Sequence, residues 1–177
     1  MKQIKTRQLV QTALLLSLCL MGQLFRQFGQ YFTGTITNTT IILAVLAVGL
    51  SGGLLIGTVA PFTAILISPN PIINAVPMIL PALILGNAVI AVLVWRFRSS
   101  SGWRMGLGLI LSSVIKAAFL GSVTGWIILP LFGAPLPAPA MTMAKAAFST
   151  TQLLTALTGS LLAFLIWIPL KKYLVKN

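Results

Sequence analysis

The sequence predicts an all-α integral membrane protein that forms a single transmembrane domain over residues 1–177. Composition points to this class, because 58% of the residues are hydrophobic and only 7% are charged. The arrangement points to it as well, since apolar runs of membrane-spanning length alternate with short polar or basic segments. A net charge of +12 would suggest a nucleic-acid partner in a soluble protein. Here the cations lie mostly at the ends of apolar runs, so we expect topology to explain them and no nucleic acid to bind.

Six membrane helices joined by short loops are expected. The second and third are short for the roughly 20 residues that a span needs, and a single re-entrant hairpin is the alternative. Six spans are favoured because the combined run 36–67 is too long for one crossing, and both interpretations place the two termini on the same side. The six helices cover about 9–28, 36–50, 54–67, 75–97, 104–131 and 151–170.

Turn-forming residues mark the boundaries between these helices. A polar segment rich in Gly and Thr precedes the second helix, Ser51–Gly53 forms a tight turn, and the third helix is broken near Pro61. Prolines and asparagines then mark the connection 68–71. A proline-rich loop, 133–139, follows the fifth helix, and Met141–Phe148 forms a short amphipathic helix.

The distribution of cations predicts the orientation. With six spans, the inner segments are the leader, the Ser51–Gly53 turn, the 96–104 loop and the C-terminal tail, and outside lie only Arg26 and Lys145. This excess of inner cations places both termini in the cytoplasm. The inner segments hold nine of the twelve cations, namely Lys2, Lys5, Arg7, Arg96, Arg98, Arg104, Lys171, Lys172 and Lys176.

Lys116 is the charge that membrane topology does not explain. It lies roughly 18 Å along the fifth helix from Arg104, past the midplane. An ammonium group at such depth costs on the order of 2.5–3.5 kcal/mol. The chain has no Asp or Glu, so none of its own side chains supplies a carboxylate. Water, backbone carbonyls or a ligand must compensate, although snorkelling toward the outer surface is the alternative.

Other polar residues gather toward the same outer half and predict a ligand pocket that opens outward. Each also has a structural interpretation: Asn38 and Gln152 as helix-start residues, Asn87 as a contact between helices, Trp126 as an interfacial residue and Lys145 as a solvated charge. The candidate substrate-binding residues are Lys116, Asn87, Asn38, Asn74, Trp126, Gln152 and Lys145.

The residues that the chain lacks exclude several kinds of chemistry. Without His, Asp or Glu there is no metal-hydrolytic site, no catalytic triad and no acidic proton relay. No phosphate-binding glycine-rich loop with its lysine is present either, so ATP is not bound in that way. We therefore expect no enzyme, no metal and no cofactor, and a transported solute would need energy from a partner.

Ala13 and Ser17 lie four residues apart in the first helix, a spacing of small residues that allows close helix packing. With this pair, the chain resembles the substrate-binding (S) components of energy-coupling factor (ECF) transporters, the vitamin-uptake ABC systems of prokaryotes. Size, short loops, basic ends and the order of segments support the resemblance over nearly the whole chain. Those segments are ITNTTIILAVLAVGLSGGLLIGTVAPFTAIL, LPALILGNAVIAVLVW, IKAAFLGSVTGWIILPL and STTQLLTALTGSLLA, with a Pro/Asn loop after the first and a Pro-rich loop before the last.

The resemblance implies a multi-pass protein of the prokaryotic plasma membrane that binds a vitamin from outside with high affinity. Such a protein then associates with a transmembrane coupling protein and two ATPases, which bind the ATP, and topples in the membrane to release the solute inside. The resemblance also implies that Ala13 and Ser17 face the coupling protein. The usual Ala-xxx-Ala is Ala-xxx-Ser here, which leaves the docking register open.

Two other functions remain possible from the sequence: a solitary facilitator or channel, and a non-transport scaffold subunit. A continuous polar path through the inner half would favour the facilitator, and the sequence shows none. A lysine without a carboxylate disfavours a cationic solute. We expect a neutral or anionic small heterocycle, held by amide hydrogen bonds and stacked on Trp126.

Overall fold

The computed structural model describes residues 6–25, 28–100 and 102–174. Throughout these residues the regular structure is helical, without a strand, which confirms the all-α prediction. Four of the cations used to predict the orientation, Lys2, Lys5, Arg26 and Lys176, lie outside the described residues.

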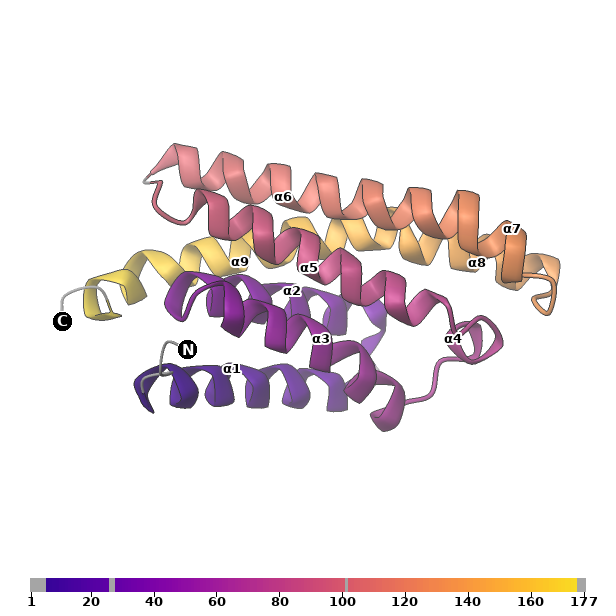
Figure 1. Ribbon diagram of the computed structural model, residues 1–177, viewed down its shortest axis with the longest axis horizontal. Coiled ribbons are helices and arrows are strands. Elements are labelled where there is room, and N and C mark those ends of the chain that lie inside the picture. Colours follow the sequence, from indigo (N-terminus) through magenta and orange to yellow (C-terminus); the bar gives the residue numbers. More distant parts are fainter. Residues whose placement is uncertain (1–5, 26–27, 101, 175–177) are drawn as a thin grey trace.

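Long helices run side by side along the length of the molecule (Figure 1). Two short helices, α4 and α8, lie in connections between them. A six-residue π-helix, η2, continues α6 into α7, so the segment Trp103–Phe132 is one uninterrupted rod. The elements are α1 (Thr6–Leu24), α2 (Gln30–Ala47), α3 (Leu50–Ile67), α4 (Pro71–Ala75), α5 (Ile79–Phe97), α6 (Trp103–Ser122), η2 (Val123–Ile128), α7 (Leu129–Phe132), α8 (Ala138–Phe148) and α9 (Thr150–Leu174).

The start of α2 corrects the predicted boundary at residue 36, because the polar segment before it is helical from Gln30. Its threonines satisfy their hydroxyl groups within the helix. Thr37 donates to the carbonyl of Thr33 at 2.9 Å, and Thr39 donates to that of Thr35 at 2.8 Å. Polar side chains that bond the preceding turn of their own helix can occupy a membrane helix without breaking it.

Two predicted interruptions of α3 are also wrong. The turn between α2 and α3 falls at Val48–Gly49, where Gly49 has a φ of +117°, and Ser51–Gly53 is already helical. Gly53 serves packing, since an added Cβ would lie 2.2 Å from a methyl group of Val45 on α2. The helix also continues through Pro61, which removes one backbone hydrogen bond without ending it.

The centre of the bundle is α2, which packs against α1, α3, α5 and α9. Ten of its eighteen residues are buried, and these include Thr35, Asn38, Thr39 and Thr40. Its polar side chains therefore face the protein interior. This explains why α2 is polar for a helix at the centre of an apolar bundle.

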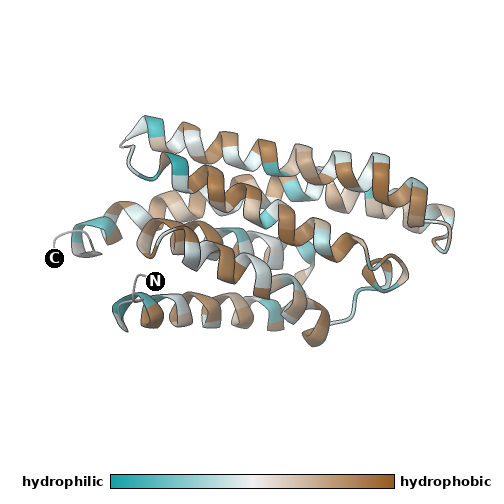
Figure 2. Ribbon diagram, viewed as in Figure 1, coloured by the Kyte–Doolittle hydropathy of each residue, from teal (hydrophilic) through white to brown (hydrophobic). Residues whose placement is uncertain are grey.

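Hydrophobic residues predominate along the helices (Figure 2), and many large apolar side chains are exposed on the outside of the bundle. Within the described residues, four segments are long and apolar enough to cross a membrane: Leu50–Ile67, Ile79–Phe97, Trp103–Phe132 and Ala138–Lys172. These support a multi-pass membrane protein. The six crossings and the cytoplasmic termini stay predictions, and α1 and α2 are not among the four segments.

Most of the described cations lie at one end of the bundle. There α1 begins, α5 ends, α6 begins and α9 ends (Figure 1). Arg96 lies in the last turn of α5, Arg104 in the first turn of α6, and Lys171 and Lys172 in the last turn of α9. We call this the basic end. The opposite end carries α4, the connection from α7 to α8 and the start of α9.

Candidate functional site

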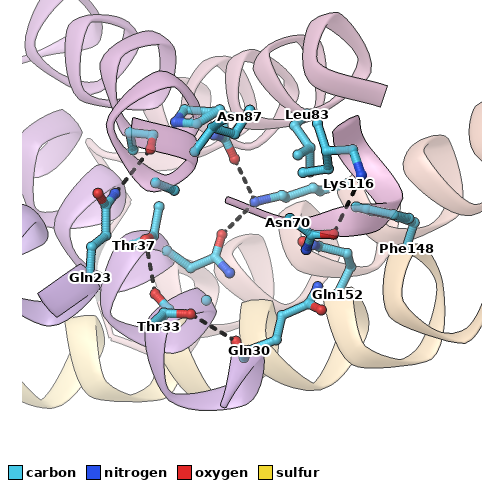
Figure 3. A pocket seen from close by; sticks show the side chains of 17 residues that line it. Gln23, Gln30, Thr33, Thr37, Asn70, Leu83, Asn87, Lys116, Phe148 and Gln152 are labelled. Carbon is cyan, nitrogen blue, oxygen red and sulfur yellow. Dashed lines mark hydrogen bonds between the residues drawn. The ribbon is translucent and has the colours of Figure 1, made fainter. Parts of the chain in front are cut away.

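A cavity of about 120 Å³ lies inside the half of the bundle opposite the basic end. Eight helices contribute to its wall, together with the residue before α4. They are α1, α2, α3, α4, α5, α6, α8 and α9. Figure 3 shows the side chains that line it. The polar members are Gln23, Gln30, Thr33, Thr37, Asn38, Asn70, Asn87, Lys116 and Gln152, and the others are Gly34, Ala60, Pro61, Ala64, Ile65, Ile73, Leu83 and Phe148.

Within the part of the chain that the structure describes, Lys116 is the one charged residue of this wall, and only 2% of it is exposed. Its ammonium group reaches from α6 to two asparagines on two other helices (Figure 3). Nζ donates to Oδ1 of Asn38 on α2 at 2.5 Å and to Oδ1 of Asn87 on α5 at 2.8 Å. An ammonium group has three donors, so these two contacts leave one N–H for the cavity.

Both asparagines are held with their oxygen toward the lysine. The Nδ2 group of Asn87 donates to the carbonyl of Gly57 at 2.9 Å. That carbonyl is available because Pro61, four residues further along α3, has no N–H to donate to it. Gly57 also permits the approach, since an added Cβ would lie 3.1 Å from Cβ of Asn87. A proline in one helix thus sets the direction of an amide in another.

Asn38 is fixed from the other side of the cavity. Its Nδ2 group donates to Oγ1 of Thr155 on α9 at 3.4 Å. Thr155 in turn donates to the carbonyl of Gln152 at 3.2 Å. The side-chain carbonyl dipoles of Asn38 and Asn87 therefore both point at the ammonium group of Lys116 and stabilise its positive charge.

Further amides and hydroxyls complete the wall. Gln23 donates to the carbonyl of Ala60 at 3.0 Å and accepts from Thr63 at 2.9 Å. Asn70 accepts from the backbone of Ile72 at 2.9 Å as the cap of α4, which leaves its amide NH₂ unused. Gln152 is 9% exposed, and its side chain has no hydrogen bond among the described residues. The cavity therefore offers neutral donors and acceptors around one cation.

Four of the seven predicted substrate-binding residues line this cavity: Lys116, Asn87, Asn38 and Gln152. The other three lie elsewhere. Asn74 is exposed on α4 and Lys145 is exposed on α8. Trp126 lies in the π-helix with 85% of its surface exposed and is not among the residues that line the cavity.

Most of the polar lining residues that are not among the predicted ones come from the start of α2. Gln30, Thr33 and Thr37 follow helical spacing and share one face of that helix. Their spacing identifies them once the segment is assigned as a helix. Gln23 is a buried lining residue near the end of α1.

Packed side chains fill the bundle between the cavity and the basic end. One turn from Lys116, Ser113 contacts Ser160 at 2.8 Å and donates to the carbonyl of Ala156 at 3.0 Å. Beyond this pair lies a buried apolar cluster that includes Leu109, Val94 and Trp167. The wall of the cavity is therefore closed on this side.

The outer surface of α1 carries the two small residues predicted to contact a partner. Ala13 and Ser17 are both exposed. Large apolar side chains beside them, such as Leu14 and Met21, are exposed too. Ser17 also lines a shallow apolar groove between α1 and α3, with Leu20, Met21, Leu24, Thr63, Leu66 and Ile67.

An apolar helical bundle that surrounds a partly open polar cavity is the architecture of a membrane protein that holds a small polar solute. Among the described residues no group of His, Cys, Asp or Glu has the arrangement of a metal site. The family model described as "ECF transporter, substrate-specific component" matches residues 7–171. The chain belongs to this family and is a substrate-binding subunit of a transporter. No curated protein and no solved structure gives a significant match.

Proposed function

We propose that this chain is the high-affinity substrate-binding subunit of an ECF-type ABC importer of the prokaryotic plasma membrane. It captures a vitamin or a related small heterocycle, neutral or anionic, from outside. A transmembrane coupling protein and two ATPases then drive its release inside. The observation that carries this proposal is the polar cavity around Lys116, Asn38 and Asn87, in a chain that belongs to a family of transporter substrate-binding components.

The position of the cavity supports capture from one side only. It lies away from the basic end, which the positive-inside rule assigns to the cytoplasm. The Ser113–Ser160 contact and the apolar cluster separate it from that end. A solute bound here reaches the cytoplasm only if the subunit changes its position or its helices separate. This requirement favours a partner-driven mechanism over a solitary facilitator. A scaffold subunit does not need a solute-binding cavity, so the cavity also disfavours that alternative.

The exposed face of α1 supports docking of the coupling protein. Small side chains let two helices approach closely, and Ala13 and Ser17 present such a surface beside exposed leucines. The groove that begins at Ser17 extends this surface onto α3. We therefore assign α1 and the adjoining side of α3 to the coupling protein.

A pull-down from native membranes in mild detergent tests the proposal. The tagged chain should co-purify with a larger membrane protein and two nucleotide-binding subunits, identified by mass. Ser17→Phe should reduce this recovery, because a large side chain prevents close helix approach. Ala118→Phe is the matched control, since Ala118 is an exposed small residue on α6. Recovery of the chain alone from intact membranes would contradict the proposal and put the solitary facilitator first.

A further inference from the structure

The charge of the cavity restricts its ligand more sharply than the proposed function does. Among the described residues all other lining side chains are neutral, so this part of the wall carries a single positive charge. The sequence contains no Asp or Glu, so none of its side chains can bring a carboxylate to Lys116. A bound molecule can supply the negative charge that compensates the protonated lysine.

The two asparagines hold the lysine but do not neutralise it. Each offers a carbonyl dipole, and each is prevented from turning its NH₂ group inward by a hydrogen bond of its own, to Gly57 or to Thr155. The ammonium group is thereby kept in place with one N–H left over. A preformed donor of this kind binds an anionic oxygen through a charge-assisted hydrogen bond.

From this we infer that the substrate is a small monocarboxylate whose carboxylate group binds Nζ of Lys116. This inference rests on the proposed function and narrows its substrate class. One negative charge matches the one positive charge of the wall, whereas a phosphate ester would bring about 1.5–2 negative charges at pH 7. A cation would leave two like charges buried together, and a neutral amide would leave Lys116 uncompensated.

The rest of the wall fits the remainder of such a molecule. The unused NH₂ group of Asn70 can donate to the second carboxylate oxygen or to a ring acceptor. Gln152 offers an amide without a partner, which can pair with an amide or heterocyclic edge. The cavity volume of about 120 Å³ is small beside the roughly 300–1,000 Å³ of sites for drug-sized ligands. A single-ring or comparably compact molecule suits it.

Retention of a defined panel by the purified chain tests the inference. The panel is an equimolar mixture of water-soluble vitamins in four charge classes: the monocarboxylates nicotinate, biotin and pantothenate; the neutral nicotinamide and pyridoxine; the cationic thiamine; and the phosphate ester pyridoxal phosphate. The chain in lipid nanodiscs is incubated with the mixture and washed, and the retained compound is identified by mass. We expect a monocarboxylate to be retained. Retention of a neutral vitamin or of the phosphate ester would overturn the inference and leave the proposed function standing. Retention of thiamine would overturn the inference and also the neutral or anionic substrate of the proposed function, and retention of none would overturn both proposals.

Asn38→Asp supplies the carboxylate that the chain lacks, at the same size and position. The hydroxyl of Thr155, which donates to the carbonyl of Gln152 in the wild type, can turn to donate to the new oxygen. We expect affinity for the retained monocarboxylate to fall at least about tenfold, as it should in Lys116→Met, on the scale of one charged hydrogen bond. Lys172→Met removes the same charge from an exposed site at the basic end and should bind like the wild type. Wild-type affinity in Asn38→Asp, with monodisperse elution confirming the fold, would overturn the inference.

Discussion

The two halves of this bundle differ in what their interiors contain. In the half opposite the basic end, amides, hydroxyls and one lysine face a polar cavity. In the half nearer the basic end, apolar side chains such as Leu109, Val94 and Trp167 pack without such a space, and the cations lie at the ends of the helices. The same helices, α2, α5, α6 and α9, run through both halves. Whether a residue faces the cavity or the apolar packing therefore depends on its position along a helix and not on which helix it belongs to.

This difference indicates that stability and binding depend on different residues. Packing in the apolar half holds the helices together, and hydrogen bonds in the polar half fix the direction of the groups that meet the solute. Asn87 and Ile90 illustrate the division, since they lie three residues apart on α5. Asn87 contacts Lys116, and Ile90 belongs to the buried apolar cluster. The predictions below test how complete this separation is.

Leu109→Ala should produce the largest loss of stability. Leu109 is buried in the apolar cluster, and its truncation removes packing atoms and leaves a cavity. We expect the free energy of unfolding to fall by about 2–5 kcal/mol. Affinity for the retained monocarboxylate should stay within twofold of wild type, because Leu109 lies seven residues from Lys116 and does not line the site. Unfolding in mixed micelles and ligand titration measure the two quantities, and a parallel loss of binding would break the separation.

Pro61→Ala should leave the stability of the protein unchanged or raised while it lowers ligand affinity. An alanine restores the N–H that proline lacks, so α3 gains a backbone hydrogen bond to the Gly57 carbonyl and becomes no less stable. The same hydrogen bond competes with the Nδ2 group of Asn87 for that carbonyl. With the Asn87 amide held less firmly, we expect affinity to fall by about three- to tenfold, on the scale of one hydrogen bond.

Thermal unfolding and ligand titration of Pro61→Ala distinguish this role from a general structural one. Pro77→Ala is the control, since Pro77 lies outside a helix and does not line the cavity. If Pro61→Ala lowers stability and leaves affinity unchanged, the proline acts on the fold and does not position Asn87.

Ser113→Ala tests the boundary between the halves. It removes the hydrogen bonds to Ser160 and to the carbonyl of Ala156, one turn from Lys116. We expect a loss of about 0.5–1.5 kcal/mol in the free energy of unfolding. Affinity should change less than twofold, because the two asparagines and not this serine hold the lysine. A larger loss of affinity would move the boundary of the site toward the apolar half.

The apolar half was easier to predict from the sequence than the polar half. Uninterrupted apolar runs predicted the end of α5 and both ends of the helical segment Trp103–Phe132 to within a few residues, because a membrane-spanning helix requires such runs. Lys116 and Asn87 stood out as polar residues within them. The start of α2 was missed because its threonines and Gln30 turn inward to the cavity, which gives a central helix the composition of a loop. Hydropathy records how polar a segment is and not which way its side chains face.

Trp126 shows a second reason why the polar half was harder to predict, and its substitution has the smallest expected effect on affinity. A regular helix continued from Lys116 gives a predictable face, but the π-helical turn at Val123–Ile128 adds residues per turn and rotates the side chains that follow. Trp126 consequently points outward, with 85% of its surface exposed, as an interfacial residue would. We expect Trp126→Ala to change affinity for the retained monocarboxylate less than twofold. Gln152→Ala, which truncates a side chain in the cavity wall, is the positive control and should weaken binding several-fold. If titration shows that Trp126→Ala loses more affinity than Gln152→Ala, aromatic stacking contributes to the site and the π-helix must rearrange when the solute binds.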